Sequence, residues 1–324
     1  MKQIDPKTIP VPDVQRLLQG AIAPRPIALV SSLSADGIPN LSPFSFYNVF
    51  GANPPIVVFS PARRGRDASL KDTYLNCQTT GECVIQAVSF SMVEQINLAS
   101  AEFSSEIDEF VKSGLTPVPS LKVKPSRVKE SPFQMECKVL EIKSYGNGGA
   151  SANLIICEVL LFHVAEDIIE DGMILPDRID LVSRMGGDYY NRAVSPNVFE
   201  VVKPLNKLGI GYENLPFALK QSDILTANDL AKLANFEKIP EFDEVMQFFQ
   251  SYISSLKQEN YYTIESFFRS LTPFRPEETL SHIAFMISMK KSFHNQDYIF
   301  AAKSFLKANM TEIAWYILIA GKTL

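Results

Sequence analysis

The sequence predicts a mainly β N-terminal domain with peripheral helices, followed by an all-α C-terminal helical domain. Up to residue 195, short runs of β-branched and aromatic residues alternate with turns that contain glycine, asparagine or proline, which is the pattern of β-strands. In the C-terminal part, apolar residues recur instead at the spacing of an α-helix. We therefore predict a first domain over 1–195, a linker over 196–206 and a helical domain of unknown function over 207–324.

The first elements of the N-terminal domain follow one another closely. Pro12 to Gly20 has the pattern of a short amphipathic helix that ends at a glycine. The apolar run from Ile27 to Leu33 predicts a strand, and the turn at 34–37 joins it to a second strand because Gly37 can adopt a positive φ. Ile56 to Ser60 and Glu82 to Val88 predict two further strands.

Two long strand-like runs dominate the second half of this domain. They extend from Phe133 to Tyr145 and from Asn153 to Ala165, and the glycine-rich segment 146–149 joins them. A dinucleotide-binding loop would require a helix after its glycines, whereas a strand follows here. The glycines therefore predict a β-hairpin.

The region between these strands is less regular. Ser91, with Glu94 three positions later, predicts a helix start in which the serine is the N-cap. From Glu102 to Pro132 the periodic pattern weakens and prolines multiply. This segment predicts a long surface excursion where a lid or a dimer contact could be built.

The C-terminal part predicts a small helical bundle. One helix carries an apolar stripe made of Phe242, Val245, Met246, Phe249, Ile253 and Leu256. Four more helices are predicted over Thr263–Leu271, Glu277–Met289, Gln296–Leu306 and Thr311–Ile319. Prolines mark the breaks at Pro240, Pro273 and Pro276. We find no catalytic motif in this part, and we expect Trp315 to lie in its core.

Composition excludes several classes of function. A net charge of -5 and a pI near 5.4 argue against broad nucleic-acid binding, which needs a basic face. The N-terminal residues lack the apolar centre of a signal peptide. The apolar run from Ile313 to Ala320 is far shorter than the roughly 20 residues that span a bilayer. We therefore expect a cytoplasmic protein that binds neither nucleic acid nor membrane.

The cysteines and histidines offer little for a metal centre. The four cysteines contain no C-x-x-C pair, and the three histidines are widely separated. We therefore predict no metal site. The cysteines are expected to be buried, reduced thiols. They are Cys77, Cys83, Cys137 and Cys157.

The segment Ser42–Asn48 has the composition of a ligand-binding stretch. Its sequence, Ser-Pro-Phe-Ser-Phe-Tyr-Asn, alternates small hydroxyl groups with aromatic rings and ends on an amide. This mixture suits a planar heteroaromatic ligand with a polar edge and apolar faces. The alternative is a strand end whose aromatic side chains enter a core and whose serines face water.

A cationic segment lies shortly downstream. It contains Arg63, Arg64, Arg66 and Lys71, and the residues from Ala68 to Thr79 have helical character. Lys71, Asp72 and Thr73 would then fall in or near the first turn of a helix. Helix N-termini present unpaired N–H groups and a partial positive charge, which suits a phosphate. The alternative is a solvated basic loop.

Together, these motifs resemble the flavin reductase-like, FMN-binding split-barrel family. The similarity is greatest to its flavoredoxin and nitrilotriacetate-monooxygenase-component-B-like branch, and it covers roughly the first 195 residues. No single motif is specific, but their order and spacing are. The matching segments are Ala23–Ser32, Asp36–Leu41, Ser42–Asn48, Pro54–Ser60, Lys71–Thr73, Thr80–Glu82, Ser100–Phe103, Gly114–Pro117, Glu130–Pro132, Glu136–Cys137 and Arg184–Tyr190.

The resemblance implies a split β-barrel that pairs as a homodimer and binds FMN non-covalently in a groove between the barrels. It implies three sets of flavin contacts. The isoalloxazine ring would be bordered by Ser45, Phe46, Tyr47 and Asn48, with Ser31 on the neighbouring strand. The phosphate would be held by Ser60, Lys71 and Thr73, with Arg66 among the nearby arginines. Supporting contacts would come from Arg25 and from the 184–190 segment, which includes Tyr189.

The resemblance also implies a function. The leading hypothesis is an NAD(P)H-dependent flavin reductase that supplies reduced flavin or electrons to a monooxygenase or other redox partner. Hydride arrives at and leaves from the flavin, so the protein need only bind, orient and tune it, and we assign no catalytic side chain. One alternative is a flavoredoxin-like electron carrier or a non-catalytic FMN-binding module, which docks a partner through the C-terminal helices. Another alternative is a structural protein that has lost the flavin groove.

Two features depart from the family pattern. Gln86 and Ala87 stand where members often have valine and asparagine, and Cys83 replaces a phenylalanine. The C-terminal helices are the larger departure, because typical members end soon after the segment that corresponds to 184–190.

Overall fold

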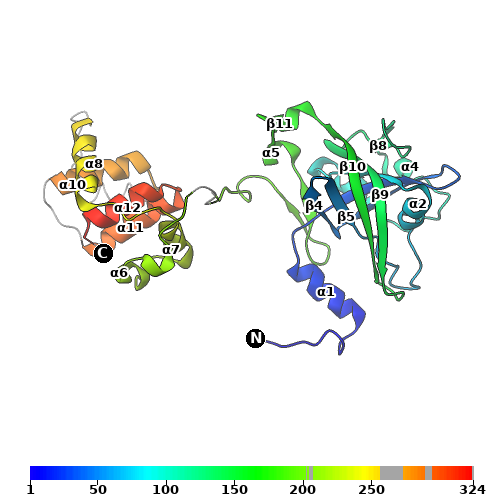
Figure 1. Ribbon diagram of the computed structural model, residues 1–324, viewed down its shortest axis with the longest axis horizontal. Coiled ribbons are helices and arrows are strands. Elements are labelled where there is room, and N and C mark those ends of the chain that lie inside the picture. Colours follow the sequence, from blue (N-terminus) through cyan, green and yellow to red (C-terminus); the bar gives the residue numbers. More distant parts are fainter. Residues whose placement is uncertain (202, 204–206, 256–272, 289–293, 323–324) are drawn as a thin grey trace. The chain divides into compact units, whose positions relative to one another are not determined.

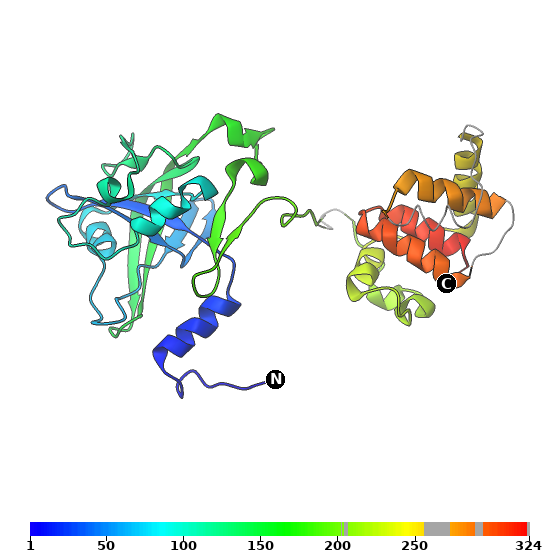
Figure 2. The same ribbon diagram turned by 180° about the vertical axis from the view of Figure 1, so that it is seen from behind.

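The computed structural model describes residues 1–201, 203, 207–255, 273–288 and 294–322. The chain divides into two compact units, Met1–Glu200 and Val201–Leu324. The first unit contains the described β-strands, and the second is built from helices (Figure 1 and Figure 2). None of the described helices is long and apolar enough to cross a bilayer.

A seven-stranded sheet forms the centre of the N-terminal unit, with the strand order β3-β2-β6-β9-β10-β5-β4. Neighbouring strands are antiparallel throughout. Its strands are β2 (Ala28–Leu33), β3 (Pro39–Phe44), β4 (Tyr47–Ala52), β5 (Pro55–Phe59), β6 (Glu82–Gln86), β9 (Phe133–Tyr145) and β10 (Ala152–Val164). The predicted hairpins β2–β3 and β9–β10 are confirmed.

The hairpin of β9 and β10 is the longest element of the sheet (Figure 1). Side chains along β10 alternate between buried and half-buried from Asn153 to Val159, as expected when successive residues point to opposite faces. Register shifts occur at Ile156/Cys157 and at Val159/Leu161. Such bulges bend a strand and increase its twist, which lets a long hairpin curve around a core.

Short strands complete the unit. β1 (Arg25–Pro26), β13 (Val182–Arg184) and β14 (Tyr190–Arg192) form a three-stranded sheet in the order β1-β13-β14. Two small hairpins pair β7 (Pro117–Val118) with β8 (Arg127–Val128), and β11 (Ile169–Glu170) with β12 (Met173–Ile174). The pairing of β1 with β13 joins the start of the unit to its end, which short-range sequence patterns do not predict.

The helices of this unit are short. They are α1 (Val11–Ala21), α2 (Asp72–Thr80), η1 (Phe90–Met92), α3 (Val93–Leu98), α4 (Glu109–Ser113), η2 (Glu166–Ile168) and α5 (Pro176–Ile179). The prediction of α1 is confirmed. The predicted helix over 68–79 begins only at Asp72, because Ala68 has a positive φ of 59° and Lys71 is extended.

The prediction that Ser91 caps a helix is wrong. A 3-10 turn, η1, precedes α3, so the N-cap of α3 is Met92. The Ser91 hydroxyl instead makes a hydrogen bond of 2.9 Å with the hydroxyl of Ser89. The predicted excursion between 102 and 132 contains α4, β7 and β8.

Two apolar cores lie on opposite faces of β2. Ala28 and Val30 belong to one core, whereas Leu29 belongs to the other, together with Leu41 and Met92. The alternation of side chains along a strand explains this division. The first core contains all four cysteines, which are buried and free, so the prediction of buried thiols is confirmed.

The C-terminal unit contains η3 (Tyr212–Asn214), α6 (Phe217–Lys220), α7 (Ala227–Ala234), α8 (Phe242–Ser255), α10 (Pro276–Ser288), α11 (Asn295–Lys307) and α12 (Thr311–Ala320). The predicted helices at α8, α10, α11 and α12 are confirmed. The helix predicted over Thr263–Leu271 lies outside the described residues, as do Leu256 and Met289. The sequence pattern missed α6 and α7, although Thr226 and Asp229 form a capping box at the start of α7.

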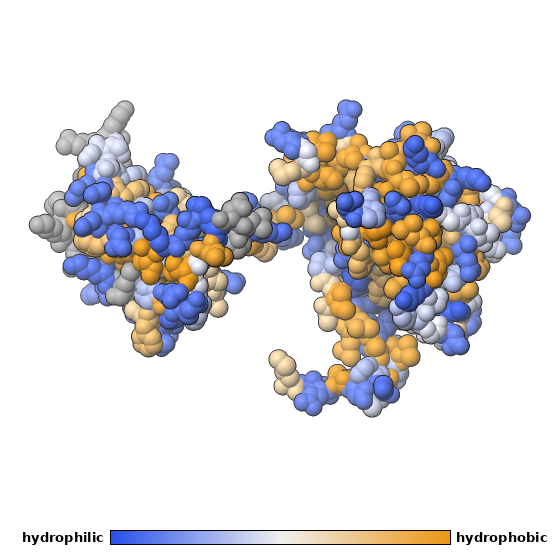
Figure 3. Space-filling model, viewed as in Figure 1, coloured by the Kyte–Doolittle hydropathy of each residue, from blue (hydrophilic) through white to orange (hydrophobic). Residues whose placement is uncertain are grey.

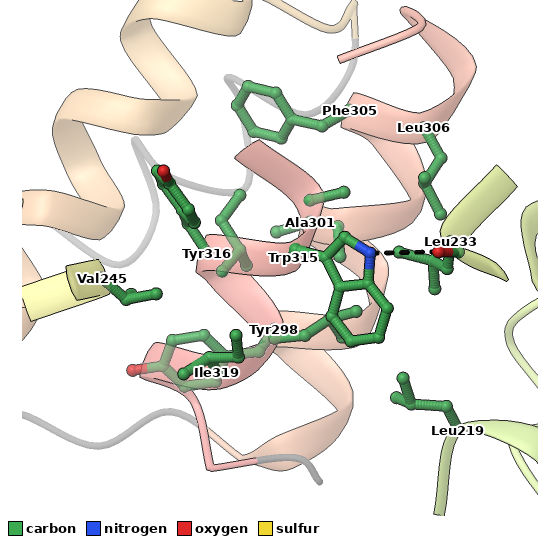
Figure 4. Packing of buried hydrophobic residues seen from close by; sticks show 14 of the residues in the cluster. Leu219, Leu233, Val245, Tyr298, Ala301, Phe305, Leu306, Trp315, Tyr316 and Ile319 are labelled. Atoms are coloured by element: carbon green, nitrogen blue, oxygen red, sulfur yellow. Dashed lines mark hydrogen bonds between the residues drawn. The ribbon is translucent and has the colours of Figure 1, made fainter. Parts of the chain in front are cut away.

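One apolar cluster fills the C-terminal unit (Figure 4). Trp315, Phe249 and Phe305 are fully buried in it. The indole Nε1 of Trp315 donates a 3.2 Å hydrogen bond to the carbonyl oxygen of Leu233, so its polar atom is satisfied inside the core. The prediction that Trp315 is a core residue is confirmed.

Candidate functional site

The stretch Ser42–Asn48 joins the two edges of the seven-stranded sheet. Its first residues end β3, and Tyr47 begins β4, which lies at the opposite edge. Only Ser45 and Phe46 connect these strands. Because two residues span only about 7 Å of extended chain, the sheet must curl until its two edges approach each other. The stretch therefore lies where the sheet closes.

Side chains in this stretch differ in exposure. Phe44 is buried and its ring lies 5.6 Å from that of Phe59, whereas Phe46 and Asn48 are exposed. Tyr47 is mostly buried, and burial raises the pKa of its phenol well above the ordinary value. The phenol therefore remains a hydrogen-bond donor at neutral pH. The Asn48 side-chain oxygen accepts a 2.8 Å hydrogen bond from Val49 N.

Ser60 supports the stretch from the end of β5. Its backbone N–H donates a 2.8 Å hydrogen bond to the carbonyl oxygen of Phe46. Its hydroxyl accepts a 3.1 Å hydrogen bond from the backbone N–H of Asn153. Ser60 thus ties the turn between β3 and β4 to β10.

Two other predicted hydroxyl groups are also engaged inside the protein. The Ser31 hydroxyl donates to the carbonyl oxygen of Ser126 and accepts a 3.3 Å hydrogen bond from Gln86 Nε2. The Thr73 hydroxyl donates a 2.7 Å hydrogen bond to the side-chain oxygen of Asn40. Ser31 and Thr73 are each only 1% exposed, so these hydroxyls shape the neighbourhood and do not line its surface.

Asn40 connects Thr73 to a buried carboxylate that the sequence analysis did not single out. Glu109, on α4, accepts hydrogen bonds from Asn40 Nδ2 at 3.2 Å and from the backbone N–H of Leu41 at 3.0 Å. Burial raises the pKa of Glu109 above its ordinary value, although these hydrogen bonds oppose the increase. The network holds the start of α2, strand β3 and α4 together.

Lys71 occupies the N-cap position of α2, where no side chain caps the helix. Its Nζ lies 5.7 Å from the centre of the Phe44 ring. Lys71 is half-buried, and burial is the main reason that its pKa is lowered. It forms no ion pair with any described carboxylate, although the charges of Glu102 and Asp72 act on it. Its position at the N-cap puts it next to the N–H groups of the first turn of α2.

The three arginines of the cationic segment have different partners. Arg66 is exposed and pairs with Asp67 at 3.0 Å and Glu102 at 2.8 Å. Arg64 pairs with Asp72 at 3.2 Å and Glu102 at 3.4 Å.

Arg63 has no carboxylate partner within the part of the chain that the structure describes. Its Nε is buried without a hydrogen-bond partner, while Nη1 donates to the carbonyl oxygen of Ala68 at 2.9 Å. The sequence offered no signal that singled out Arg63 from its neighbours. Of the four cations in this segment, Lys71 and Arg63 therefore form no ion pair with a described carboxylate.

The tip of the β9–β10 hairpin holds this cationic loop. The backbone N–H of Arg63 donates to Ser151 O at 3.0 Å, and Ala150 N–H donates to Arg63 O at 3.1 Å. A Cβ atom on Gly149 would lie 2.6 Å from the carbonyl oxygen of Gly65. Only glycine fits this contact, so the glycine-rich turn also allows the loop to approach the hairpin closely.

Arg25 lies on the other side of Phe44. It is buried, and its guanidinium donates to the carbonyl oxygens of Gln19 at 2.6 Å, Ile22 at 3.0 Å and Met185 at 2.9 Å. Its Nε also lies 3.4 Å from the Ser45 hydroxyl. The structure therefore brings the predicted Arg25, Ser45 and 184–190 segment together, around a cavity of about 240 Å³. Tyr189 does not line this cavity, and its side chain is 78% exposed.

A second buried carboxylate holds the surface excursion in place. Glu136 is fully buried and accepts hydrogen bonds from the backbone N–H groups of Leu121, Lys122 and Val123. It also lies 2.6 Å from His163 Nε2. Burial opposes the ionisation of Glu136, but these hydrogen bonds outweigh it and hold its pKa below the ordinary value.

The N-terminal unit matches known proteins over most of its length. Residues 21–179 match the model of the flavin reductase like domain. An uncharacterized protein of Halalkalibacterium halodurans is 38% identical over 192 residues, which are 59% of this chain and 91% of the relative. The chain belongs to the flavin reductase-like family.

Solved structures of this family agree with that assignment. Nitrilotriacetate monooxygenase component B from Bacillus cereus is 32% identical, with a TM-score of 0.59 over 62% of this chain and 98% of the other. A split-barrel protein from Shewanella frigidimarina, assigned to the flavin reductases, is 25% identical, with a TM-score of 0.52 over 60% of this chain and 96% of the other. The predicted flavin reductase-like split barrel is confirmed for the N-terminal unit.

Proposed function

We propose that the N-terminal unit binds FMN non-covalently and that the protein is an NAD(P)H-dependent flavin reductase, which supplies reduced flavin or electrons to a partner. The observation that carries this proposal is a set of donors without ion-pair partners, at the start of α2 and in the loop that precedes it. Lys71 and Arg63 lack described carboxylate partners, and the first turn of the nine-residue helix has no side-chain cap. A phosphate would satisfy all three sets of donors.

The rest of the flavin would extend from this phosphate site along the closure of the sheet. Phe44 lies beside Lys71, and Ser45 to Asn48 follow it directly in the chain. In this arrangement, Phe46, Tyr47 and Asn48 border the ring. Ser31, Ser60 and Thr73 act indirectly, because their hydroxyls hold β2, β5 and α2 in place.

The chemistry follows from this division of roles. When bound, FMN accepts a hydride and passes electrons on, so the protein need only orient the ring and control access to it. The name of the relative from Bacillus cereus, a monooxygenase component, favours a monooxygenase as the partner that receives reduced flavin or electrons.

We also propose that the barrel pairs with a second copy. Exposed apolar residues lie on β4, which is an edge strand, in the turn that precedes it, and on the β9–β10 hairpin, which β5 separates from β4. Figure 3 shows the hydrophobic colour on the face of this unit where these strands lie. Such a patch favours a partner surface, and an edge strand of this kind needs cover. Its members are Phe46, Val49, Phe50, Leu140, Leu160 and Phe162.

The test of the flavin proposal compares two lysines that both lie over aromatic rings. Lys71→Gln should weaken FMN binding by at least about tenfold, because a charge-assisted phosphate contact is lost. Lys112→Gln is the matched control, since Lys112 lies 5.5 Å from the ring centre of Phe103 and outside the proposed groove. The affinity would be measured by titrating the visible flavin absorption.

Activity would be measured on the same preparations by following NADH and NADPH oxidation in the presence of FMN. A protein that binds FMN but oxidises neither nucleotide would contradict the reductase proposal. Equal FMN affinity in both variants and in the wild type would contradict the phosphate site.

The second candidate is an electron carrier or a non-catalytic FMN-binding module. The C-terminal unit favours it, because this compact unit has its own core and exposes the aromatic side chains of Phe217 and Phe300. Such a protein would hold FMN tightly, oxidise NAD(P)H slowly or not at all, and bind a redox partner through its helices. The two activity measurements distinguish it from the reductase.

A further inference from the structure

The pairing of β1 with β13 places two arginines directly opposite each other. Arg25 is the Cα partner of Arg184 in this antiparallel ladder. Like charges in directly opposite positions are destabilising, and Arg25 is only 6% exposed. Burial, and then the charge of Arg184, lower the pKa of Arg25. The fold therefore keeps two cations close together against their mutual repulsion.

Neither arginine is neutralised within the described part of the chain. Arg25 donates to backbone carbonyl oxygens. Arg184 donates to the Tyr190 hydroxyl at 2.8 Å and to the carbonyl oxygen of Gly187 at 2.9 Å. All these acceptors are uncharged. Arg184 lines both cavities and can contact an anion there, particularly a phosphate or pyrophosphate, while the buried Arg25 adds a second positive charge.

Two cavities meet at this pair. The smaller one, of about 240 Å³, is lined by Arg25, Arg184 and Tyr190, and also by Phe44 and Ser45 of the proposed flavin groove. The larger one, of about 450 Å³, shares Arg184 and Tyr190. It extends between α3 and the β13–β14 hairpin, where Phe90 and Val93 form an apolar wall.

From this arrangement we infer that the two cavities form the binding site for the reductant and that this reductant is NADH. Arg184 contacts the pyrophosphate and the buried Arg25 adds positive charge beside it, the nicotinamide points towards Ser45 and the flavin, and the adenosine half occupies the larger cavity. The inference rests on the proposed flavin reductase function. It adds the location of the second substrate and the choice between the two nicotinamide nucleotides.

The charges of the larger cavity favour NADH over NADPH. Glu94 and Asp188 line this cavity, and neither pairs with a described cation. A carboxylate accepts hydrogen bonds from the ribose hydroxyls of NADH but repels the 2′-phosphate of NADPH. Arg192 also lines the cavity, but its guanidinium is already bound by both carboxylate oxygens of Asp180, at 2.7 and 2.8 Å.

The experiment measures binding without turnover, by calorimetric titration of the full, FMN-loaded chain with NAD⁺ and NADP⁺. The wild type should bind NAD⁺ at least about tenfold more tightly than NADP⁺. Arg184→Gln should weaken NAD⁺ binding by at least about tenfold and FMN binding by much less than that. Arg178→Gln is the matched control, because Arg178 pairs with Glu170 and lines neither cavity.

A second pair of variants tests the choice of nucleotide. Glu94→Gln and Asp188→Asn should each raise NADP⁺ affinity relative to NAD⁺ by at least about fivefold. If Arg184→Gln fails to fold by circular dichroism, Arg184→Lys serves instead. It keeps the charge but loses the planar fork, so a smaller loss of NAD⁺ affinity is expected.

Three outcomes would overturn the inference. A wild type that binds FMN but neither nucleotide would remove the site while leaving the flavin proposal intact. If Arg184→Gln weakened FMN binding as much as NAD⁺ binding, the arginine pair would belong to the flavin site. Unchanged NAD⁺ to NADP⁺ ratios in both carboxylate variants would refute the role of Glu94 and Asp188. A wild type that does not bind FMN would instead contradict the proposed function itself.

Discussion

The two units of this protein differ in what they bury. The described helical unit fills one continuous cluster with apolar side chains, of which Trp315, Phe249 and Phe305 are the largest that are fully buried. The barrel unit has two apolar cores and buries many polar or charged side chains around them. These include Arg25, Ser31, Gln86, Glu109, Glu136 and Asn153.

The difference indicates a division of labour. A buried polar group is costly unless it is hydrogen-bonded. A fold that retains many such groups therefore uses them to fix the positions of its elements more than to increase its stability. In the barrel unit these groups hold α2, the closure of the sheet and the surface excursion in fixed places. The helical unit also buries Asp229, Thr279, Ser281 and His282, whereas the two cavities described above lie in the barrel unit. Substitutions should therefore affect the two units in separate ways.

The largest expected effect is on the stability of the helical unit. Phe249→Ala should lower its free energy of unfolding by about 3–5 kcal/mol, because a fully buried ring is lost and a cavity remains. FMN affinity should not change. Denaturant unfolding followed by the fluorescence of Trp315, the single tryptophan, measures the first quantity.

Phe300→Ala is the control for this substitution, since the Phe300 ring is 52% exposed on α11. It should change stability by less than about 0.5 kcal/mol. A parallel loss of FMN affinity in Phe249→Ala would show that the two units are not independent.

The next effect concerns the carboxylate that holds the surface excursion. Glu136→Gln should destabilise the barrel unit by about 2 kcal/mol, because hydrogen bonds to a buried charge are replaced by weaker ones. The loss should appear in flavin-monitored unfolding near neutral pH. Glu141→Gln, a change on the exposed part of β9, should have little effect. A stability equal to that of the wild type would show that this carboxylate does not hold the excursion.

The same residue predicts a dependence on pH. The folded-state pKa of Glu136 lies below the ordinary value of 4.5, so its ionised form stabilises the fold above about pH 4.5. This stabilisation is lost as the pH falls through the folded-state pKa. Glu136→Gln should therefore lose less stability than the wild type on acidification. Identical pH profiles for the two proteins would contradict this assignment.

A smaller effect is expected at Asn40, which connects Thr73 to Glu109. Asn40→Ala should cost about 1 kcal/mol of stability and weaken FMN binding by about fivefold, because the start of α2 is held less firmly. Asn147→Ala, in the hairpin turn, is a control of the same residue type. The FMN affinity of both variants would be measured by titration. Equal affinities would show that the Asn40 network does not support the phosphate site.

The smallest effect on FMN affinity is expected when the whole C-terminal unit is deleted. Removal of 201–324 leaves the barrel unit alone. The match to this protein covers 91% of the relative from Halalkalibacterium halodurans and 98% of the solved structure from Bacillus cereus. FMN affinity should therefore stay within about twofold of the wild type. Binding of a redox partner should be lost if the helices dock it. A truncated chain that still captures every partner of the full protein would contradict the docking role.

Local patterns in the sequence predicted the parts of the fold that depend on neighbouring residues. The β9–β10 hairpin and α8 have long, periodic segments, and both were predicted closely. The position of Arg25 opposite Arg184 could not be predicted, because their strands have two and three residues and lie far apart in the chain. The missed α7 did have a signal, the capping box of Thr226 and Asp229.

The candidate site shows the same limit. The motif order predicted that Ser45 and Lys71 belong to one flavin-binding region, because the resemblance spans both, and this remains a prediction. It did not separate side chains that face a groove from those that turn inward. Thr73 and Ser31 point into internal networks, and Arg63 lacks the partners that Arg66 has. Those distinctions depend on long-range contacts that a motif does not contain.

The contact between Gly149 and Gly65 has a consequence for how such chains can diverge. The tip of the β9–β10 hairpin fixes the position of the cationic loop, because the two backbones are in direct contact and leave no room for a methyl group on Gly149. One inserted residue in that turn would shift Arg63 without altering any charged side chain. The length of this turn should therefore affect the affinity for FMN if Arg63 contacts its phosphate as proposed, although the turn lies far from Arg63 in the sequence.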